Sequence, residues 1–90
     1  MYASIHCFTG VQDTTVDVLR AARQLAAALS RQPGFVSYAM LEADNHVGIS
    51  VTVFETHAGL VEANQFAAVW AAEHLTGWSA GPPRITTGSG

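Results

Sequence analysis

The sequence predicts an α+β domain in which two helices cover one face of a four-stranded antiparallel sheet, in the order β-α-β-β-α-β. The clearest sign is the segment 47–54, where large apolar residues alternate with mostly small or polar ones, as in a strand. Two further segments, 14–31 and 56–75, repeat apolar residues at helical spacing, and strand-like runs flank each of them. With 90 residues, the chain is expected to form one domain over 1–90.

The first strand and the first helix are predicted from residue type and capping. Residues 2–9 (YASIHCFT) are rich in aromatic and β-branched types and end at a glycine, which indicates a strand. The helix is expected to begin at Thr14 as its N-cap, with Asp17 in a capping-box position. It should end near Arg31, because Pro33 disfavours helix in the residue before it. Its apolar stripe consists of Val18, Leu19, Ala22, Leu25, Ala26 and Leu29.

The middle of the chain predicts a β-hairpin. Residues 35–41 and 47–54 form its two strands, and the polar segment 42–46 supplies the turn, so the strands are antiparallel. Side chains on the second strand point alternately to the two faces of the sheet. One face receives Val47, Ile49, Val51 and Val53, and the other receives Gly48, Ser50, Thr52 and Phe54.

The last third of the chain predicts the second helix and the fourth strand. The helix is expected to begin after Thr56 as its N-cap and to stop near Leu75, before Gly77. Two adjacent prolines follow; they cannot donate ladder hydrogen bonds and therefore belong at the beginning of the last strand, 84–87. The tail 88–90 is expected to fray. This order of elements is the split βαβ, or ferredoxin-like, arrangement.

Composition predicts that a second copy of the chain covers the open face of the sheet. Apolar residues make up 49% of the chain and charged residues only 12%, which is too few to solvate every surface. The alternative is that the many alanines inflate the apolar count. We expect the semi-polar face that carries Ser50, Thr52 and Phe54 to be the open one, available for sheet-to-sheet packing in a homodimer.

Charge and cysteine content exclude several classes of partner. The net charge is −3, and the four basic residues, Arg20, Arg23, Arg31 and Arg84, form no stripe that could neutralise phosphates. Nucleic acid and anionic membrane surfaces are therefore not expected partners. Without an apolar run of 18 residues or a signal-peptide pattern, a cytoplasmic location is expected. Cys7 is the single cysteine and is expected to be a small buried hydrophobic residue.

Two short motifs resemble the antibiotic biosynthesis monooxygenase (ABM) superfamily. PGFVSY, residues 33–38, is similar to a PGF-x-x-Y pattern in that family, and Phe54-Glu55 is similar to its aromatic-Glu pair before the second helix. The resemblance implies a dimeric α/β barrel. It also implies relatives that include cofactor-independent oxygenases of polycyclic aromatic substrates, haem-degrading enzymes and proteins without known activity. Family members often carry a central His on the second helix, whereas this chain has His57 at its start and His74 near its end.

Trp70, His74 and His6 are the candidates for chemistry. Trp70 and His74 are four residues apart on the second helix and could form an aromatic wall with a proton donor or acceptor. The alternative is a core tryptophan with a histidine that suits the helix dipole. His6 could act as a general base near neutral pH if its strand face meets the helices. The alternative is a core or dimer-interface histidine.

Tyr38 and Asn64 are the candidates for orienting a ligand. The Tyr38 hydroxyl could hold a substrate, or the ring could simply pack on the sheet. Asn64, of a residue type that catalytic members of the resembled family use on this helix, could bind a carbonyl or an oxygen-derived species, or be solvated. His46 and His57 are expected at the surface. No pair of histidines has metal-ligand spacing, and no phosphate-binding glycine loop is present in the sequence, so no metal or other cofactor is expected.

These observations support two hypotheses for the function. In the first, an ABM-like homodimer binds a small hydrophobic or aromatic molecule and oxidises it with O₂ without metal or flavin. His6 or His74 would be the base, Trp70 the wall, and Asn64 and Tyr38 the orienting residues. In the second, the chain is a non-catalytic ligand-binding or dimerisation module on the same fold.

Overall fold

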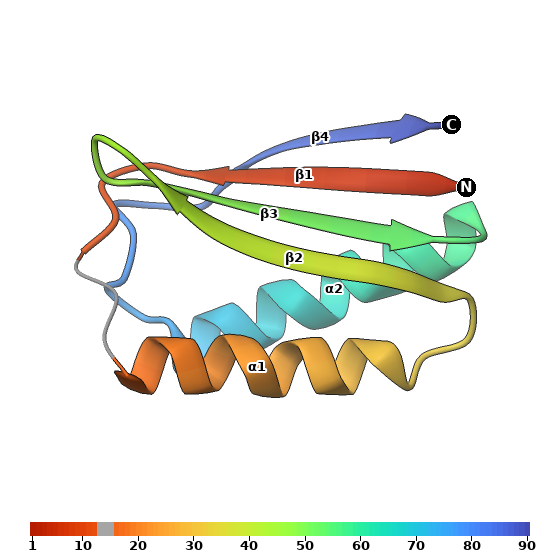
Figure 1. Cartoon of the computed structure of the whole chain (residues 1–90), viewed down its shortest axis with the longest axis horizontal. Coiled ribbons are helices and arrows are strands. Elements are labelled where there is room, and N and C mark those ends of the chain that lie inside the picture. The colour runs from red at the N-terminus through yellow and green to blue at the C-terminus, as the bar shows by residue number, and fades with distance from the viewer. Residues whose placement is uncertain (13–15) are drawn as a thin grey trace.

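The predicted order of elements is confirmed by a computed structural model, which describes residues 1–12 and 16–90 (Figure 1). The predicted N-cap Thr14 lies outside the described residues. Predicted boundaries agree to within about two residues, as is usual for strand and helix ends. The elements are β1 (Tyr2–Phe8), α1 (Val16–Ser30), β2 (Phe35–Ala43), β3 (Val47–Phe54), α2 (His57–His74) and β4 (Arg84–Ser89).

The four strands form one antiparallel sheet in the order β2-β3-β1-β4, with both helices on the same face (Figure 1). β1 lies in the middle, where Phe8 pairs with Gly48 of β3 and His6 pairs with Ile85 of β4. The hairpin between β2 and β3 turns through two residues with positive φ, Asn45 and His46. Apart from glycine, asparagine, aspartate and histidine are the residues most often found in this conformation, so the turn chemistry agrees with the observed register.

The hydrophobic core lies at one end of the helix–sheet interface. It consists of Leu25, Leu29, Phe54, Leu60 and Ala63. The predicted cap of α2 is confirmed, because the Thr56 hydroxyl accepts a hydrogen bond from the Gly59 N–H at 3.0 Å. Gly59 suits this tight corner, since a Cβ there would lie 3.0 Å from the Thr56 hydroxyl oxygen and 3.1 Å from the Phe54 ring. The glycine that weakens the helix in isolation therefore lets it sit closely on the core.

The prediction of which face of the sheet is open was wrong. Ser50, Thr52 and Phe54 are 5%, 3% and 0% exposed and face the helices, so the valine side of β3 is the open one. The physical reason is that Phe54 fills the core at one end of β3. The two hydroxyl residues, by contrast, lie under a part of the interface that the helices leave unfilled. The open face is consequently apolar, and Ile5 of β1, opposite Val51, is 45% exposed on it.

The C-terminal tail is ordered rather than frayed. β4 continues to Ser89, which pairs with Tyr2, and the Gly90 N–H donates to the Met1 carbonyl at 2.9 Å. The N-terminal ammonium in turn donates to the Gly90 carbonyl at 3.1 Å. Backbone pairing with residues 2–7 of β1 orders this tail, although its glycine-rich sequence has little tendency to form a strand by itself.

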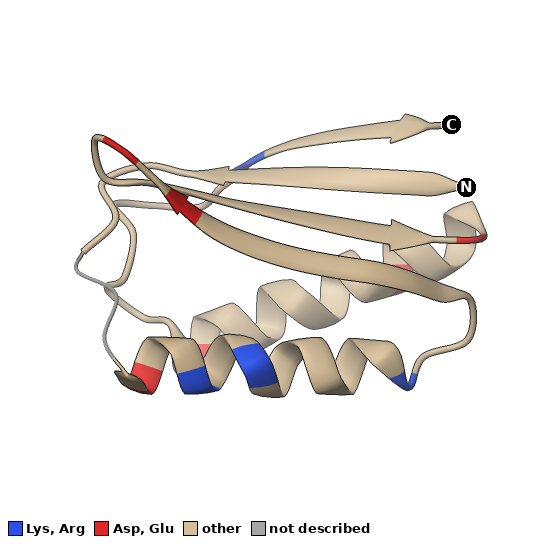
Figure 2. Cartoon of the chain, viewed as in Figure 1, with Lys and Arg blue, Asp and Glu red and all other residues tan. Residues whose placement is uncertain are grey.

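Charged residues are sparse in the sheet (Figure 2). Glu42 and Arg84 are the only charged residues in the four strands, and Figure 2 shows two of the arginines on α1. Neither helix among residues 1–12 and 16–90 has the length and the apolar character of a transmembrane span.

Candidate functional site

A cavity of about 600 Å³ lies between α2, the sheet and the segment that follows α2. The helix side of this cavity is lined by alanines one turn apart, Ala67 with Ala71 and Ala68 with Ala72. Alanine side chains end at Cβ, so they leave open the space that leucines would fill at the same positions. The cavity is therefore encoded by the alanine-rich sequence of α2, in contrast to the leucine-filled core at the other end of the interface.

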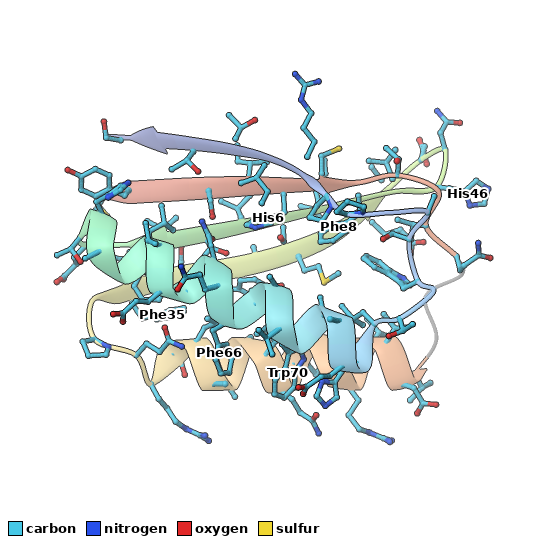
Figure 3. All side chains as sticks on the ribbon, turned by 180° about the vertical axis from the view of Figure 1, so that it is seen from behind. His6, Phe8, Phe35, His46, Phe66 and Trp70 are labelled. Atoms are coloured by element: carbon cyan, nitrogen blue, oxygen red, sulfur yellow. The ribbon has the colours of Figure 1, made fainter. Side chains whose placement is uncertain are left out.

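His6 lines this cavity from the middle of β1. Its side chain faces the helices and is 8% exposed, and its ring lies 6.5 Å from that of Phe8 in a stacked arrangement (Figure 3). The Nδ1 atom is buried and has no hydrogen-bond partner among the described residues. Burial lowers the pKa of His6 below its ordinary value of 6.5, because an imidazolium loses its hydration there. His6 is thus a neutral imidazole at pH 7, which can accept a proton.

A row of hydroxyl groups from β2 and β3 lines the floor of the same cavity. Tyr38 lies opposite Thr52, and Met40 lies opposite Ser50. Burial raises the pKa of the Tyr38 hydroxyl above its ordinary value of 10.0, and a hydrogen bond with Ser50 partly offsets that rise. Tyr38 therefore stays protonated over the physiological range and can donate a hydrogen bond. The Tyr38 oxygen also lies 3.9 Å from the Met40 sulfur.

Asn64 lines the cavity from α2 and is tied to β1. The Ser4 hydroxyl donates to the Asn64 carbonyl oxygen, Oδ1, at 2.8 Å. Ser4 itself is fully buried and lies two residues before His6 on the same face of β1. Three of the predicted site residues, His6, Tyr38 and Asn64, are thus brought together around one cavity.

Trp78 is a cavity residue that the sequence reasoning missed. It is 6% exposed, its ring lies 5.4 Å from Phe8, and its Nε1 is buried without a partner among the described residues. Two backbone hydrogen bonds fix its position, one from its N–H to Leu75 and one from Gln12 to its carbonyl. Gly48 could have indicated that another group packs against β3 at this position, because a glycine inside a strand often marks a close approach.

Trp70 and His74 lie outside the cavity lining. Their rings stack at 4.2 Å, and the His74 Nδ1–H donates to the Trp70 carbonyl at 3.1 Å on the exposed end of α2. Trp70 also stacks on Phe66 at 6.1 Å and packs against the hydrophobic core (Figure 3). In Figure 3 the labelled Phe66 and Trp70 point away from the sheet, whereas His6 and Phe8 lie on it.

The other two histidines lie at the surface, as the sequence indicates. His46 is exposed at the hairpin tip, where its Nδ1–H donates to the Val11 carbonyl at 3.0 Å. His57 is exposed at the start of α2, with its ring 5.5 Å from that of Tyr2. In residues 1–12 and 16–90, no group of three His, Cys, Asp or Glu side chains is arranged to hold a metal ion.

A second, smaller hollow of about 310 Å³ lies between α1 and β2. Leu19, Ala22 and Arg23 line it from the helix side. Tyr38, Met40 and Trp78 line both hollows. These three side chains therefore form the partition between the two.

Comparison with known proteins gives a match in structure but not in sequence. No family model and no curated protein matches the chain. The structure of SnoaB, a cofactor-independent oxygenase from Streptomyces nogalater, superposes with a TM-score of 0.76 at 21% identity, over 99% of this chain and 91% of that one. A protein from Nitrosomonas europaea, provisionally assigned as an antibiotic biosynthesis monooxygenase, gives a TM-score of 0.80 at 19% identity, over 99% and 88% of the two chains.

The chain has the ABM fold. A further structure with the same provisional assignment, from Caulobacter crescentus, gives a TM-score of 0.79 at 14% identity over 99% of this chain and 88% of that one. The ABM fold agrees with the ferredoxin-like arrangement predicted from the order of elements. Because identities this low establish the fold alone, the chemistry has to be argued from the cavity.

Proposed function

We propose that this chain is a small-molecule-binding ABM-like domain that acts as a cofactor-independent monooxygenase on a small aromatic substrate. The observation that supports this proposal best is the buried, unpartnered imidazole of His6 facing a cavity of about 600 Å³. A histidine that is neutral at pH 7 is in the protonation state that a general base needs, although burial also makes it a weaker base than a solvated imidazole. The similarity to a cofactor-independent oxygenase in fold points in the same direction.

The proposed reaction needs an acidic C–H or O–H on an aromatic substrate and O₂ as the oxidant. His6 takes the proton, which leaves an electron-rich anion delocalised over the ring and its oxygen substituent. The anion transfers one electron to O₂, and the two radicals combine into a peroxide. The protonated His6 returns its proton to the peroxide, which becomes a hydroperoxide. When the acidic group is a ring methylene, loss of water from this hydroperoxide leaves a carbonyl. One oxygen atom then stays in the product and the other leaves as water.

Three features of the cavity suit the binding of such an anion. The alanine face of α2 and the Phe8 ring offer apolar surface to the ring system. Tyr38, kept protonated by its raised pKa, can donate a hydrogen bond to a developing oxyanion. Asn64 can donate from its amide nitrogen. Trp70 and His74, which line neither hollow, remain candidates on the strength of the sequence alone.

We also propose that the functional unit is a homodimer. The open face of the sheet is apolar, with Ile5, Ile49 and Val51 side by side and no acidic residue in β1, β3 or β4. An exposed apolar sheet of this kind is typical of a protein–protein contact. A second copy packed on this face would leave the cavity, on the opposite face, accessible to ligand.

A binding role without turnover is the second candidate function. It is favoured by the apolar lining of the cavity and by the absence, among the described lining residues, of any acidic side chain that would orient His6. Both roles require the same pocket. They differ in whether a bound aromatic molecule is consumed.

Oxygen consumption with anthrone, a tricyclic ketone with an acidic methylene, separates the two roles. We expect the wild-type protein to accelerate O₂ uptake above the buffer rate and His6→Gln to lose about 100-fold or more of that acceleration, the usual contribution of a general base. His74→Gln is the matched control and should retain it. If anthrone binds but O₂ uptake stays at the buffer rate, the binding role is supported. If His74→Gln loses activity and His6→Gln does not, the base is His74.

A further inference from the structure

Ser4 and Asn64 form a hydrogen bond that joins β1 to α2 beside the cavity. The two residues are 60 positions apart in the chain, and the oxygen atoms Oγ and Oδ1 are 2.8 Å apart. Ser4 is 0% exposed and does not line the cavity, whereas Asn64 does. Ser4 therefore has no direct access to a ligand and can influence one only through Asn64.

The bond fixes which end of the Asn64 amide faces β1. A serine hydroxyl has one hydrogen, and in a fully buried position that hydrogen needs an acceptor. The Asn64 carbonyl oxygen supplies it. If the amide were rotated by half a turn, its NH₂ would face Ser4, and the hydroxyl hydrogen would lose this acceptor at an unfavourable free energy. The planar amide then directs its two N–H donors away from Ser4.

We propose that Ser4 is a positioning residue that makes Asn64 a hydrogen-bond donor to the cavity. The cavity then selects ligands that carry an acceptor oxygen, such as a carbonyl, next to Asn64, and discriminates against ligands that can only donate. This inference rests on the proposed function in so far as it requires a ligand in the cavity. It adds the residue that determines the polarity of the ligand at this position.

The selectivity has a consequence for the proposed reaction. When His6 removes a proton from a ring ketone, negative charge moves onto the ketone oxygen. An N–H donor held in place before the reaction stabilises that charge without a reorganisation cost. A freely rotating amide would present its carbonyl oxygen part of the time, which repels the same charge. Ser4 thus acts on the anion through the orientation of Asn64.

The first test needs no ligand. The side-chain NH₂ of Asn64 gives a pair of signals in a nitrogen–proton NMR spectrum, and its relaxation reports the mobility of the amide. We expect Ser4→Ala to shift these signals and raise their mobility, while Ser50→Ala, which removes a different buried serine hydroxyl, leaves the mobility unchanged. Identical Asn64 mobility in wild type and Ser4→Ala would overturn the proposal.

The second test uses three tricyclic probes of nearly the same shape. Fluorenone carries an acceptor oxygen, fluorene carries no polar group, and carbazole carries only an N–H donor. Affinities measured by tryptophan fluorescence should favour fluorenone over the other two by about tenfold, the value of one well-made hydrogen bond. Asn64→Asp has the same shape but no donor at neutral pH, and it should lose the preference for fluorenone.

A double-mutant cycle then assigns the effect to the pair. Ser4→Ala should lower the fluorenone preference, with fluorene affinity unchanged, and adding Ser4→Ala to Asn64→Ala should change it no further. Additive effects, or an undiminished preference in Ser4→Ala, would overturn the positioning role. If none of the probes binds wild type, the proposed function fails, while the mobility measurement still decides whether Ser4 holds the amide.

Discussion

Gly48 of β3 lies directly against the indole of Trp78. A Cβ added at position 48 would lie 2.8 Å from the Trp78 Cη2 atom and 3.5 Å from Val11. The missing side chain in the strand therefore makes room for an aromatic ring that arrives from the loop after α2. Because Trp78 lines both hollows, this one contact links the strand sequence to the shape of the cavity.

Gly48→Ala should displace Trp78 and destabilise the fold. The added methyl group overlaps a ring that is itself held by backbone hydrogen bonds, so we expect a loss of about 1–3 kcal/mol in the free energy of unfolding. Urea denaturation gives this value. Gly81→Ala is the control, since a Cβ there meets nothing within 4 Å. Equal stability of Gly48→Ala and wild type would show that the indole moves at no cost.

His6 should make the stability of the protein depend on pH in the acidic range. Its folded pKa is lowered below 6.5, so the unfolded chain binds a proton before the folded one as the pH falls. The stability that depends on a neutral His6 is therefore fully present above pH 6.5 and is lost as the pH falls toward the folded pKa. In that range the free energy of unfolding falls by at most about 1.4 kcal/mol per pH unit.

Urea denaturation at a series of pH values checks this slope. We expect His6→Gln to reduce the slope of the free energy of unfolding against pH below pH 6.5. The slope that remains comes from other titrating groups. His46→Gln should leave the wild-type slope unchanged. A wild-type curve that His6→Gln does not alter would mean that the imidazole is as well solvated in the folded state as in the unfolded one.

Ala71→Leu should close the cavity without unfolding the protein. Ala71 is a half-buried lining residue on α2, and a leucine side chain would extend into space that is now unfilled. Leucine and alanine are both strong helix formers, so we expect a stability change within about 1 kcal/mol. Binding of fluorenone, measured by fluorescence titration, should fall at least tenfold. Ala27→Leu, on the exposed side of α1, should bind as wild type does.

Ile5→Asp should convert a homodimer into monomers. Ile5 is 45% exposed on the open face of the sheet, and a carboxylate there would lose its hydration in the proposed interface. Leu19→Asp is a matched control, because Leu19 is 47% exposed but lies on α1. Light scattering with size-exclusion chromatography should give a dimer for wild type and Leu19→Asp. A wild-type monomer, or a dimer that only Leu19→Asp disrupts, would contradict the proposed interface.

The fold could be predicted from the sequence because local signals and tertiary packing agree. The alternation in β3 and the Thr56 cap of α2 each specify one element, and both are observed. The face of β3 could not be predicted, since it depends on whether the helices fill the space above Ser50 and Thr52. Whether this space is filled depends on the alanines of α2. It is therefore set by the contact between the helix and the sheet, and neither element's sequence reveals it alone.

The candidate site could be predicted only in part, for a similar reason. His6 was named from its place in a predicted strand, and Tyr38 and Asn64 with support from the resemblance to the ABM superfamily; all three lie around one cavity. Trp70 and His74 were named from their helical spacing, which correctly predicts that they are neighbours but not which side of α2 they occupy. Trp78 and Ser4 were missed, because each contacts a residue far away in the sequence. Gly48 indicates a close approach by some group, but not which residue approaches.

The central claim, that an aromatic molecule binds beside His6 under the alanines of α2, is tested most directly by an NMR titration with anthrone under nitrogen. Exclusion of oxygen keeps the molecule unreacted. The account predicts that amide signals of Ala67, Ala71 and Ser50 and the ring signals of His6 shift together and saturate with one binding constant. Shifts confined to the open face of the sheet around Ile5, or no shifts up to the solubility limit of anthrone, would contradict it.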